Sequence, residues 1–438
     1  MLLLPVALFM LGTAACENPK VDGIRIGILS DCEGFAAPFY DVTLAGAELP
    51  LLRRGGSLAG QGPSSGVNGV SVNGHPVKLV FGCAGDAVGS MIETRRLVEQ
   101  EGVDVVIGPN VIPDTFGLIE YARRHTRTAF VIATMEHAAG LDFGPNIYRF
   151  TADSVQTAAG LGGYAFNDLG WRTAKTVAPP DLWQWGLSAG FVAEFCSLGG
   201  SVVDRVWLDV VPEEVPALLR EVPLEGMDGF FVAADTESVA KFLERYAKRN
   251  PPLAEHVVSG AFTALPVLLD PSVVERLGDD LLGVVTATFV PLDASRPEWN
   301  AYVNEFRAAF PDLAETAVSA YHMLDIDYEN AMEAVMRALE AVDGDLSDGG
   351  QSFRGALAEV HLDAPNGPIR LDGRRQAILP IYLSRVEKDG KGDLVYRTFM
   401  VVDDVDQTYG GALDLNTTPD RTLPTCRAGD PPPWATSA

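Results

Sequence analysis

One short motif has the residue types and spacing of a hydrolase nucleophile. The stretch Gly186-Leu187-Ser188-Ala189-Gly190 fits the pattern G-x-S-x-G, which presents a serine for acyl transfer. That chemistry needs the serine on a tight turn directly after a strand. Here prolines and a tryptophan-rich loop separate Ser188 from the preceding strand, so Ser188 falls inside a predicted helix. We interpret the motif as small residues that allow close helix packing, and we expect no enzyme activity. The alternative is an exported serine hydrolase, which would need His256 or His322 beside Ser188 as its base.

Metal and phosphate chemistry have little support in the sequence. The histidines and cysteines have no spacing typical of a zinc site. Asp343, Asp345 and Asp348 resemble the start of a calcium loop, but they lack the glycine at the sixth position and the closing glutamate. The glycine-rich stretch 55–74 has no Gly-Lys-Ser/Thr and is predicted to be a flexible surface hairpin. We therefore expect neither a metal nor a cofactor.

Four cysteines form an even set that suits disulfides in an exported chain. Cys32 follows the first predicted strand and Cys83 ends the second, so the two should lie at one edge of the same sheet and pair. Cys196 and Cys426 then pair by elimination, which would hold the C-terminal tail. Free buried thiols are the alternative.

The N-terminus has the pattern of an export signal. An apolar run, Leu2–Leu11, is followed by Thr13-Ala14-Ala15-Cys16, which resembles a lipoprotein cleavage box with Cys16 as the lipidated residue. A run of about ten apolar residues is too short to span a bilayer. Residues 1–16 are therefore predicted to be a signal peptide, and a lipid on Cys16 would attach the mature protein to the membrane outside the cytoplasm. A plain secretion signal with an incidental cysteine is the alternative.

Length and charge limit the function classes. The chain has 438 residues, enough for two lobes or domains with large cores. Its net charge of −26 argues against a nucleic-acid partner, which would need a basic surface. We interpret the acidity as a contribution to solubility.

Strands and helices alternate along most of the chain, which predicts parallel sheets with helices on both faces. Val103–Ile107 is a buried strand closed by Gly108-Pro109, and Pro113 suits the first turn of a helix in which Phe116, Ile119 and Ala122 share a face. The helix 86–101 should turn Met91, Leu97 and Val98 inward. Other strands are predicted at 24–30, 76–82, 128–134, 146–151, 174–178, 202–208, 229–234, 257–259, 284–290, 377–386 and 394–402. Other helices are predicted at 38–54, from 186, near 213–220, from 238, at 297–310 and at 317–342.

Several blocks, in this order, resemble the type I periplasmic-binding fold of extracytoplasmic solute-binding proteins. The branch is the one typified by the leucine/isoleucine/valine-binding proteins of ABC importers. The blocks are I-R-I-G-I-L-S-D (24–31), F-G-C-A-G-D (81–86), R-R-L-V-E-Q-E-G-V-D-V-V-I-G-P (95–109), N-I-Y-R-F-T-A-D (146–153) and G-P-I-R-L-D-G (367–373). The resemblance spans about residues 22–402.

The resemblance implies two Rossmann-like three-layer αβα lobes joined by three crossing segments, which close on a ligand like a Venus flytrap. Lobe 1 would comprise 22–148 and 285–362, lobe 2 would comprise 149–284 and 363–405, and 406–438 would be an extended tail. The implied protein is a monomer that binds a small-molecule solute and delivers it to an ABC permease. A sensor of the same fold is the alternative.

Candidate ligand-binding residues lie on turns after strands, because the crevice of an open α/β sheet lies there. They are Phe35, Asn110, Val111, Ile112, Thr134 and Glu136 in lobe 1, and Trp183, Trp185, Asp235 and Phe262 in lobe 2. In amino-acid-binding relatives the turn matching Asn110–Ile112 usually carries hydroxyls for the ligand carboxylate, and here it reads N-V-I. The aromatic side chains instead suit apolar, aromatic or cationic solutes. Asp181 and Asp235 could anchor a cation, although Asp235 is equally suited to cap a helix.

Overall fold

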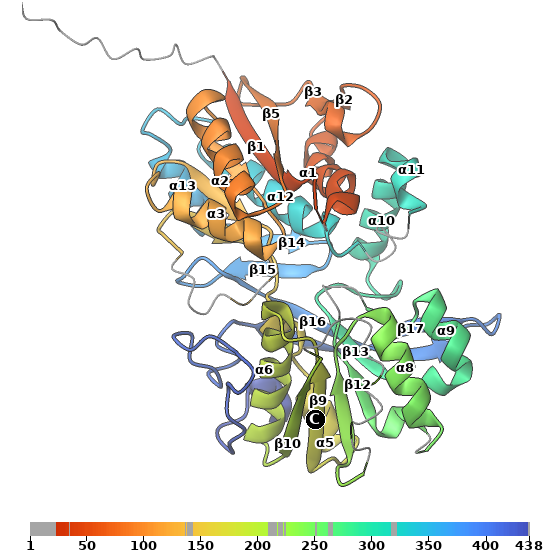
Figure 1. Ribbon diagram of the computed structural model, residues 1–438. Helices are drawn as coiled ribbons and strands as arrows, with labels where there is room; N and C mark the ends of the chain where they lie inside the picture. Colours follow the sequence, from red (N-terminus) through yellow and green to blue (C-terminus); the bar gives the residue numbers. More distant parts are fainter. Residues whose placement is uncertain are drawn as a thin grey trace, which may run out of the picture.

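The computed structural model shows two α/β lobes, one above the other, joined by short segments (Figure 1). It describes residues 23–34, 36–135, 137, 143–208, 217, 222, 225–249, 252–261, 266–316 and 322–436, with the backbone alone at 112 and 113. Cys16, Phe35, Glu136 and Phe262 lie outside the described residues. Within these ranges, no helix has both the length and the apolar character needed to cross a membrane.

Lobe 1 is built on a six-stranded sheet with helices on both faces. Its strands lie in the order β4 (Ser71–Val72), β5 (His75–Ala84), β1 (Ile24–Asp31), β6 (Val105–Ile107), β7 (Ala129–Ile132) and β8 (Ile147–Arg149). All are parallel except β4, which pairs antiparallel with β5. One face is covered by α1 (Tyr40–Arg53) and α12 (Asp325–Ala341), and the other by α2 (Ala87–Arg95) and α3 (Ile112–Ala122). Because both faces are covered, the short inner strands are apolar throughout.

Lobe 2 repeats this plan on a nine-stranded sheet. The order is β10 (Ser201–Trp207), β9 (Thr173–Ala178), β11 (Gly229–Val232), β12 (Val257–Ser259), β13 (Val285–Thr288), β16 (Ala377–Lys388), β15 (Gly367–Leu371) and β14 (Leu362–Ala364), with β17 (Leu394–Val405) also paired to β16. The first five are parallel and the rest antiparallel. One face packs against α4 (Ser154–Thr157), α5 (Leu161–Asn167) and α6 (Leu182–Ser197), and the other against α8 (Thr236–Ala247) and α9 (Pro271–Leu277). Phe231 stacks on Phe191 of α6, while its neighbour Phe230 meets Phe242 of α8.

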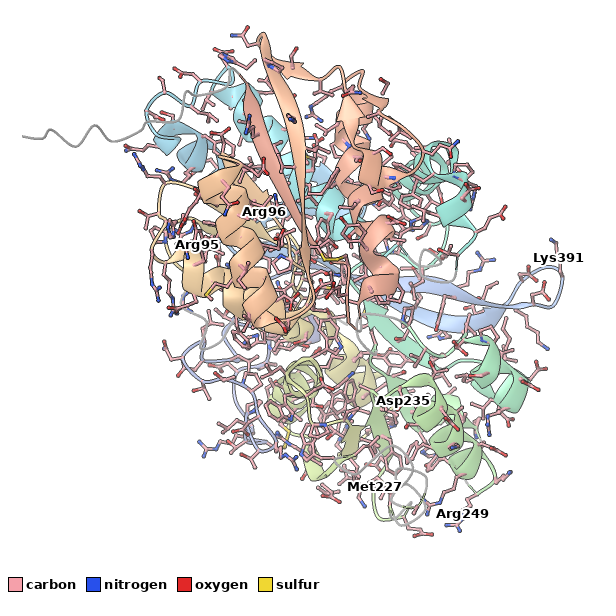
Figure 2. The ribbon with its side chains drawn as sticks, turned by 45° about the horizontal axis from the view of Figure 1, so that its top comes forward. Arg95, Arg96, Met227, Asp235, Arg249 and Lys391 are labelled. Atoms are coloured by element: carbon pink, nitrogen blue, oxygen red, sulfur yellow. A yellow bond between two sulfur atoms is a disulfide. The ribbon has the colours of Figure 1, made fainter. Side chains whose placement is uncertain are left out.

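Smaller elements complete the lobes. Against lobe 1 lie α10 (Pro297–Ala309), α11 (Pro311–Ala314), α13 (Gln351–Ala358) and the hairpin of β2 (Ser57–Leu58) and β3 (Val67–Asn68). Single helical turns occur at Ala37–Phe39, Pro63–Ser65, Arg96–Gln100, Leu253–Glu255, Gly278–Leu281 and Pro433–Thr436. Lys391 marks the protruding tip of the β16–β17 hairpin in Figure 2.

The chain crosses between the lobes three times, as the resemblance implied. It leaves lobe 1 at the end of β8 and enters α4. It returns after β13 to α10, which packs on α1. It passes back through β14 and β15 into β16. The second part of lobe 1 was predicted to begin at residue 285. Residues 285–288 instead form β13, which pairs with β12 and β16 of lobe 2. The chain therefore returns to lobe 1 after Thr288.

Two side chains depart from the predicted helix faces: Met91 was expected to face inward, and Phe116 was expected to share a face with Ile119 and Ala122, which are buried. Met91 is 38% exposed and Phe116 is 43% exposed. The buried side of α2 is formed by Ser90 and Thr94, because α2 and α3 approach closely through small residues. Ser90 Oγ donates to the Asp114 carbonyl at 2.7 Å, and Gly117 lies so close to the Ala87 carbonyl that no Cβ would fit. The helical prediction was correct in both segments, but the inward face of Met91 and the shared burial of Phe116 with Ile119 and Ala122 were wrong.

Both predicted disulfides are present. Cys32–Cys83 joins the ends of β1 and β5, and Cys196–Cys426 joins α6 to the tail, each with its Cα atoms 5.3 Å apart. The tail was predicted to be extended, but it is a series of turns that packs on lobe 2. The Trp207 indole donates to the Arg421 carbonyl at 3.2 Å. The tail and α6 together line a pocket of about 490 Å³.

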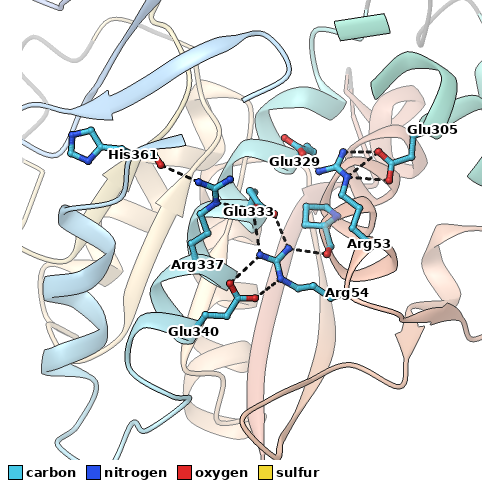
Figure 3. Close-up of polar contacts among 9 residues, drawn as sticks. Arg53, Arg54, Glu305, Glu329, Glu333, Arg337, Glu340 and His361 are labelled. Atoms are coloured by element: carbon cyan, nitrogen blue, oxygen red, sulfur yellow. Dashed lines mark hydrogen bonds and ion pairs between the residues drawn. The ribbon is translucent and has the colours of Figure 1, made fainter. Parts of the chain in front are cut away.

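Partly exposed ion pairs join α1 to α10 and α12, which are distant from it in the sequence (Figure 3). Arg53 contacts Glu329 at 2.5 Å and Glu305 at 2.8 Å, and Arg54 contacts Glu333 at 2.7 Å. Burial raises the pKa of Glu329 to about 7, and the Arg53 guanidinium opposes that rise. These contacts hold two helices together that are distant in sequence, and they depend on close approach of the helix backbones.

We expect Gly46→Ala to destabilise the protein, because a Cβ there would overlap the Asp325 carbonyl of α12. The expected loss is about 1–3 kcal/mol of unfolding free energy, measured by urea denaturation. The control is Gly355→Ala on α13, where nothing lies within 4 Å of the added Cβ. That variant should gain about 0.5–1 kcal/mol from helix propensity. Equal stability of the two variants would contradict the close α1–α12 approach.

Candidate functional site

Strand order places a crevice in each lobe, and strand direction makes the two crevices face one another. In lobe 1 the chain goes from β1 to β5 on one side and later to β6 on the other, so the topological switch point lies between β1 and β6. Ligands bind outside the carboxyl ends of the strands at such points. The carboxyl end of β8 leads into lobe 2, and that of β13 leads back to lobe 1. Both sets of parallel strands therefore end at the space between the lobes.

At the lobe 1 switch point, the turn after β6 is pressed against β1. Ile28 pairs with Ile107, the last residue of β6, so the turn that carries Asn110 begins beside the end of β1. Gly108 has a φ of +92° and lies so close to the Leu29 carbonyl that a side chain would overlap it. Glycine is therefore required here both for its conformation and for space.

The structure places the described lobe 1 candidates around this turn. Asn110 is 5% exposed, and its buried Oδ1 has no hydrogen-bond donor among the described residues. Val111 is the N-cap of α3, and Ile112 is the first residue of that helix. Thr134 follows β7 and is fully buried, and its carbonyl accepts from Arg149 at 3.3 Å. Their roles toward a ligand remain predictions.

Two buried carboxyl groups lie at this point; Asp31 begins the turn 31–35, which the sequence predicts to face the cleft, whereas Asp114 was not predicted. Asp31 ends β1 and Asp114 lies in the first turn of α3, and they are 2% and 1% exposed. Burial raises the pKa of Asp114, the hydrogen bond with Asp31 opposes the rise, and the charge of Asp86 adds to it. In the sequence, Asp114 looks like an ordinary first-turn acid. Only the packing shows that it is buried against Asp31.

At the lobe 2 switch point, between β9 and β11, two aspartates cap helices. Asp181 accepts from the Gln184 amide of α6 at 2.9 Å, and Asp235 accepts from the Ser238 amide of α8 at 3.0 Å. Figure 2 shows Asp235 at the start of α8. Asp181 is exposed to solvent, yet desolvation raises its pKa. Solvent access combined with surrounding protein is expected of a carboxylate in a concave site.

The two predicted tryptophans differ in environment. Trp183 is 7% exposed and belongs to the hydrophobic core, and its indole Nε1 donates to the Ala261 carbonyl at 3.4 Å. Trp185 is half-buried, and its Nε1 has no acceptor among the described residues. Trp183 therefore supports the shape of lobe 2 from within, while Trp185 is the better placed to meet a ligand.

A buried polar network lies where β8 leaves lobe 1. Arg149 is fully buried, with Nη2 3.5 Å from the Asp153 carboxylate. His137 Nδ1 lies 2.9 Å from the same carboxylate, and Asp153 also caps α4 in a capping box with Gln156. Burial alone would raise the pKa of Asp153, but His137 and Arg149 hold it below its usual value. One carboxylate thus joins the end of lobe 1 to the first helix of lobe 2.

The other chemical candidates are accounted for by the structure. Ser188 lies inside α6 and is 1% exposed, and no described histidine bonds to its Oγ, so it is not on a nucleophile turn. Among the described residues, the one gathering of three potential metal ligands is Cys32, Glu33 and Cys83, and its two sulfurs form a disulfide.

Comparison with known proteins relates this arrangement to a family. A family model described as periplasmic binding protein matches residues 23–391. The Leu/Ile/Val-binding protein homolog 6 of Brucella suis is 22% identical over 394 residues, which cover 88% of this chain and 93% of the relative.

Solved structures of similar shape are also solute-binding proteins. An ABC transporter substrate-binding protein from Sphaerobacter thermophilus has a TM-score of 0.71 at 21% identity, covering 88% of this chain and 99% of its own. A solute-binding protein from Rhodopseudomonas palustris BisB5, in complex with 3,4-dihydroxy benzoic acid, has a TM-score of 0.68 at 18% identity, covering 88% and 99%. A leucine-binding protein from Thermotoga maritima has a TM-score of 0.65 at 16% identity, covering 87% and 99%. These similarities confirm the predicted fold.

We expect Asp153→Ala to destabilise the protein by about 3–5 kcal/mol, because it leaves the buried Arg149 guanidinium without its carboxylate. The matched control is Asp270→Ala, which removes an exposed helix cap from α9 and should cost about 1 kcal/mol. Urea denaturation of both variants measures the difference. If the two losses are equal, Asp153 acts only as a helix cap.

Proposed function

The chain belongs to the periplasmic binding protein family, and on that premise we propose that it captures a small organic solute outside the cytoplasm and delivers it to the permease of an ABC importer. The observation that carries this proposal is that two switch points from separate lobes face one space across three short crossings. A solute that contacts both lobes favours the closed form by its differential contacts, which is a population shift. The permease would then recognise the closed form.

We propose that the solute is an amino acid or an aromatic or apolar relative of one. The relatives named above include a leucine-binding protein and a protein solved with a dihydroxybenzoic acid. In this chain, the half-buried Trp185 at the start of α6 offers an aromatic surface on the lobe 2 side. The described candidates Asn110, Val111 and Thr134 would contribute from lobe 1.

We further propose that a lipid on Cys16 attaches the protein to the membrane. Cys16 follows a short apolar run and two alanines, which is the sequence expected of a lipoprotein signal. The tether would keep the binding protein near its permease and raise their effective concentration.

Trp185→Ala should weaken solute binding, because it removes an aromatic surface from the cleft. The assay is the ligand-dependent rise of the melting temperature, screened against amino acids, aromatic acids, polyamines and amides. The control is Trp207→Ala, a half-buried tryptophan on the outer strand β10, which should leave the affinity unchanged. If the whole library leaves the melting temperature of the wild-type protein unchanged, the capture function is wrong.

Cys16→Ser should move the protein from the membrane fraction to the soluble extracytoplasmic fraction, because serine cannot accept the thioether-linked lipid. Detergent phase separation of wild-type and variant cells measures this change. Cys16→Ser protein that stays in the detergent phase would contradict the lipid anchor.

A further inference from the structure

We propose that the cleft selects a solute carrying a protonated amine or guanidinium, which is held at the lobe 1 switch point by Asp31, Asn110 and Asp114. This inference rests on the proposed function and names the chemical class of its solute. In the resemblance described above, the same turn holds the carboxylate of the ligand. The proposal therefore reverses the polarity of that half of the cleft.

The three side chains come from two adjacent turns. Asp31 ends β1, Asn110 lies in the turn after the neighbouring strand β6, and Asp114 follows four residues later in the first turn of α3. Asp114 and Asp31 share a hydrogen bond. The Tyr328 hydroxyl donates to the Leu29 carbonyl at 2.8 Å and lies within electrostatic range of both carboxyl groups. The Tyr328 ring from α12 thus packs beside the carboxyl pair.

The group is rich in oxygen acceptors that lack donors. Asn110 Oδ1 and Asp114 Oδ2 are buried, and neither accepts a hydrogen bond from a described residue. Both residues are more than nine-tenths buried. A buried acceptor without a donor costs free energy, so such groups are rare unless a partner arrives. An ammonium or guanidinium offers only donors and would satisfy both oxygens.

The charges around this group are also of one sign. Burial is the main cause that raises the pKa of Asp114 and of Tyr328; the charge of Asp86 adds to it at Asp114, and the charges of Asp31, Asp327 and Asp114 add to it at Tyr328. A solute carboxylate would meet repulsion here, whereas a cation would be attracted. Asp114 also lies at the N-terminal turn of α3, where its own carboxylate provides the negative charge that the helix dipole favours.

The opposite lobe is compatible with the same solute. Asp181 and Asp235 place carboxylates at the lobe 2 switch point, and the exposed part of Trp185 offers a ring on which a cation can rest. A solute with its charged end in lobe 1 and an apolar or aromatic body toward Trp185 would contact both lobes. Such two-sided contact is what closure requires.

The experiment compares aromatic probes of similar size that differ in charge, together with two aliphatic cations. The purified mature protein is titrated with benzylamine, benzamidine, benzamide and benzoate, and with putrescine and agmatine as aliphatic cations. Thermal shift detects binding and isothermal titration calorimetry gives the affinity. We expect at least one cation to bind, and benzoate to bind at least tenfold more weakly or not at all.

Asp114→Asn tests the assignment of the residue. It should weaken cation binding at least tenfold while the ligand-free variant melts at the same or a higher temperature, because an amide is less costly to bury beside Asp31 than a second carboxyl group. A merely structural carboxylate would instead lower the melting temperature. Asp31→Asn is a second variant with the same expected loss of affinity. Asp312→Asn, an exposed position on α11, removes one charge elsewhere and should change neither property.

Three results would overturn the inference. In the first, benzoate or another carboxylate binds more tightly than the cations, and Asp114→Asn does not change the affinity. That result would leave the proposed capture function intact and show that Asp114 does not select a cation. A rise in melting temperature with calcium chloride that Asp114→Asn abolishes would make the group a metal site. Failure of every cation and every carboxylate to bind would count against both proposals.

Discussion

The arrangement of this protein depends on a buried carboxylate where the two lobes meet. The Asp153 carboxylate pairs with Arg149 from the last strand of lobe 1 and with His137 from the segment after β7. It also caps the first helix of lobe 2. Each partner alone would be costly to bury, because a charge removed from water needs compensation. Together they fix the direction in which β8 enters lobe 2. That direction brings the carboxyl ends of both sets of parallel strands to the same space.

The acidic side chains of lobe 1 differ in how they are satisfied. Away from the cleft, carboxylates such as Glu305, Glu329 and Glu333 are paired with Arg53 and Arg54, and they hold α1, α10 and α12 together. At the cleft end, Asp114 and Asn110 keep buried oxygens without donors among the described residues. Strained or unsatisfied groups gather at functional sites because the surrounding structure supports them. Glu48, buried inside lobe 1, likewise keeps both carboxylate oxygens without donors among the described residues, so a missing donor alone does not mark a ligand site.

The tail is an addition to this plan. The family model ends at residue 391, within the β16–β17 hairpin, and the chain beyond Asp406 packs on lobe 2. The Cys196–Cys426 disulfide and the hydrogen bond from Tyr409 to Glu194 hold it against α6. Burial raises the pKa of Glu194 to about 7, while the bonds from Tyr409 and the Gly160 amide oppose that rise. The tail thus supports the helix whose first turn carries Asp181 and Trp185.

The sequence alone determined the alternation of strands and helices, the two-lobed fold and both disulfides, because these depend on local periodicity, turn residues and cysteine parity. It also predicted Ser188 inside a helix, since prolines separate it from the strand. It placed Met91 on the inward face and grouped Phe116 with the buried Ile119 and Ala122, but helix–helix contact through Ser90 and Gly117 leaves both side chains exposed. The tertiary structure decided which acids face the cleft. Asp31 and Asp114 are 83 residues apart by their numbers, and only strand register and the start of α3 bring them together as buried neighbours. Trp183, by contrast, proved to be a core residue, because its partner Ala261 lies on a strand end that no local pattern links to α6.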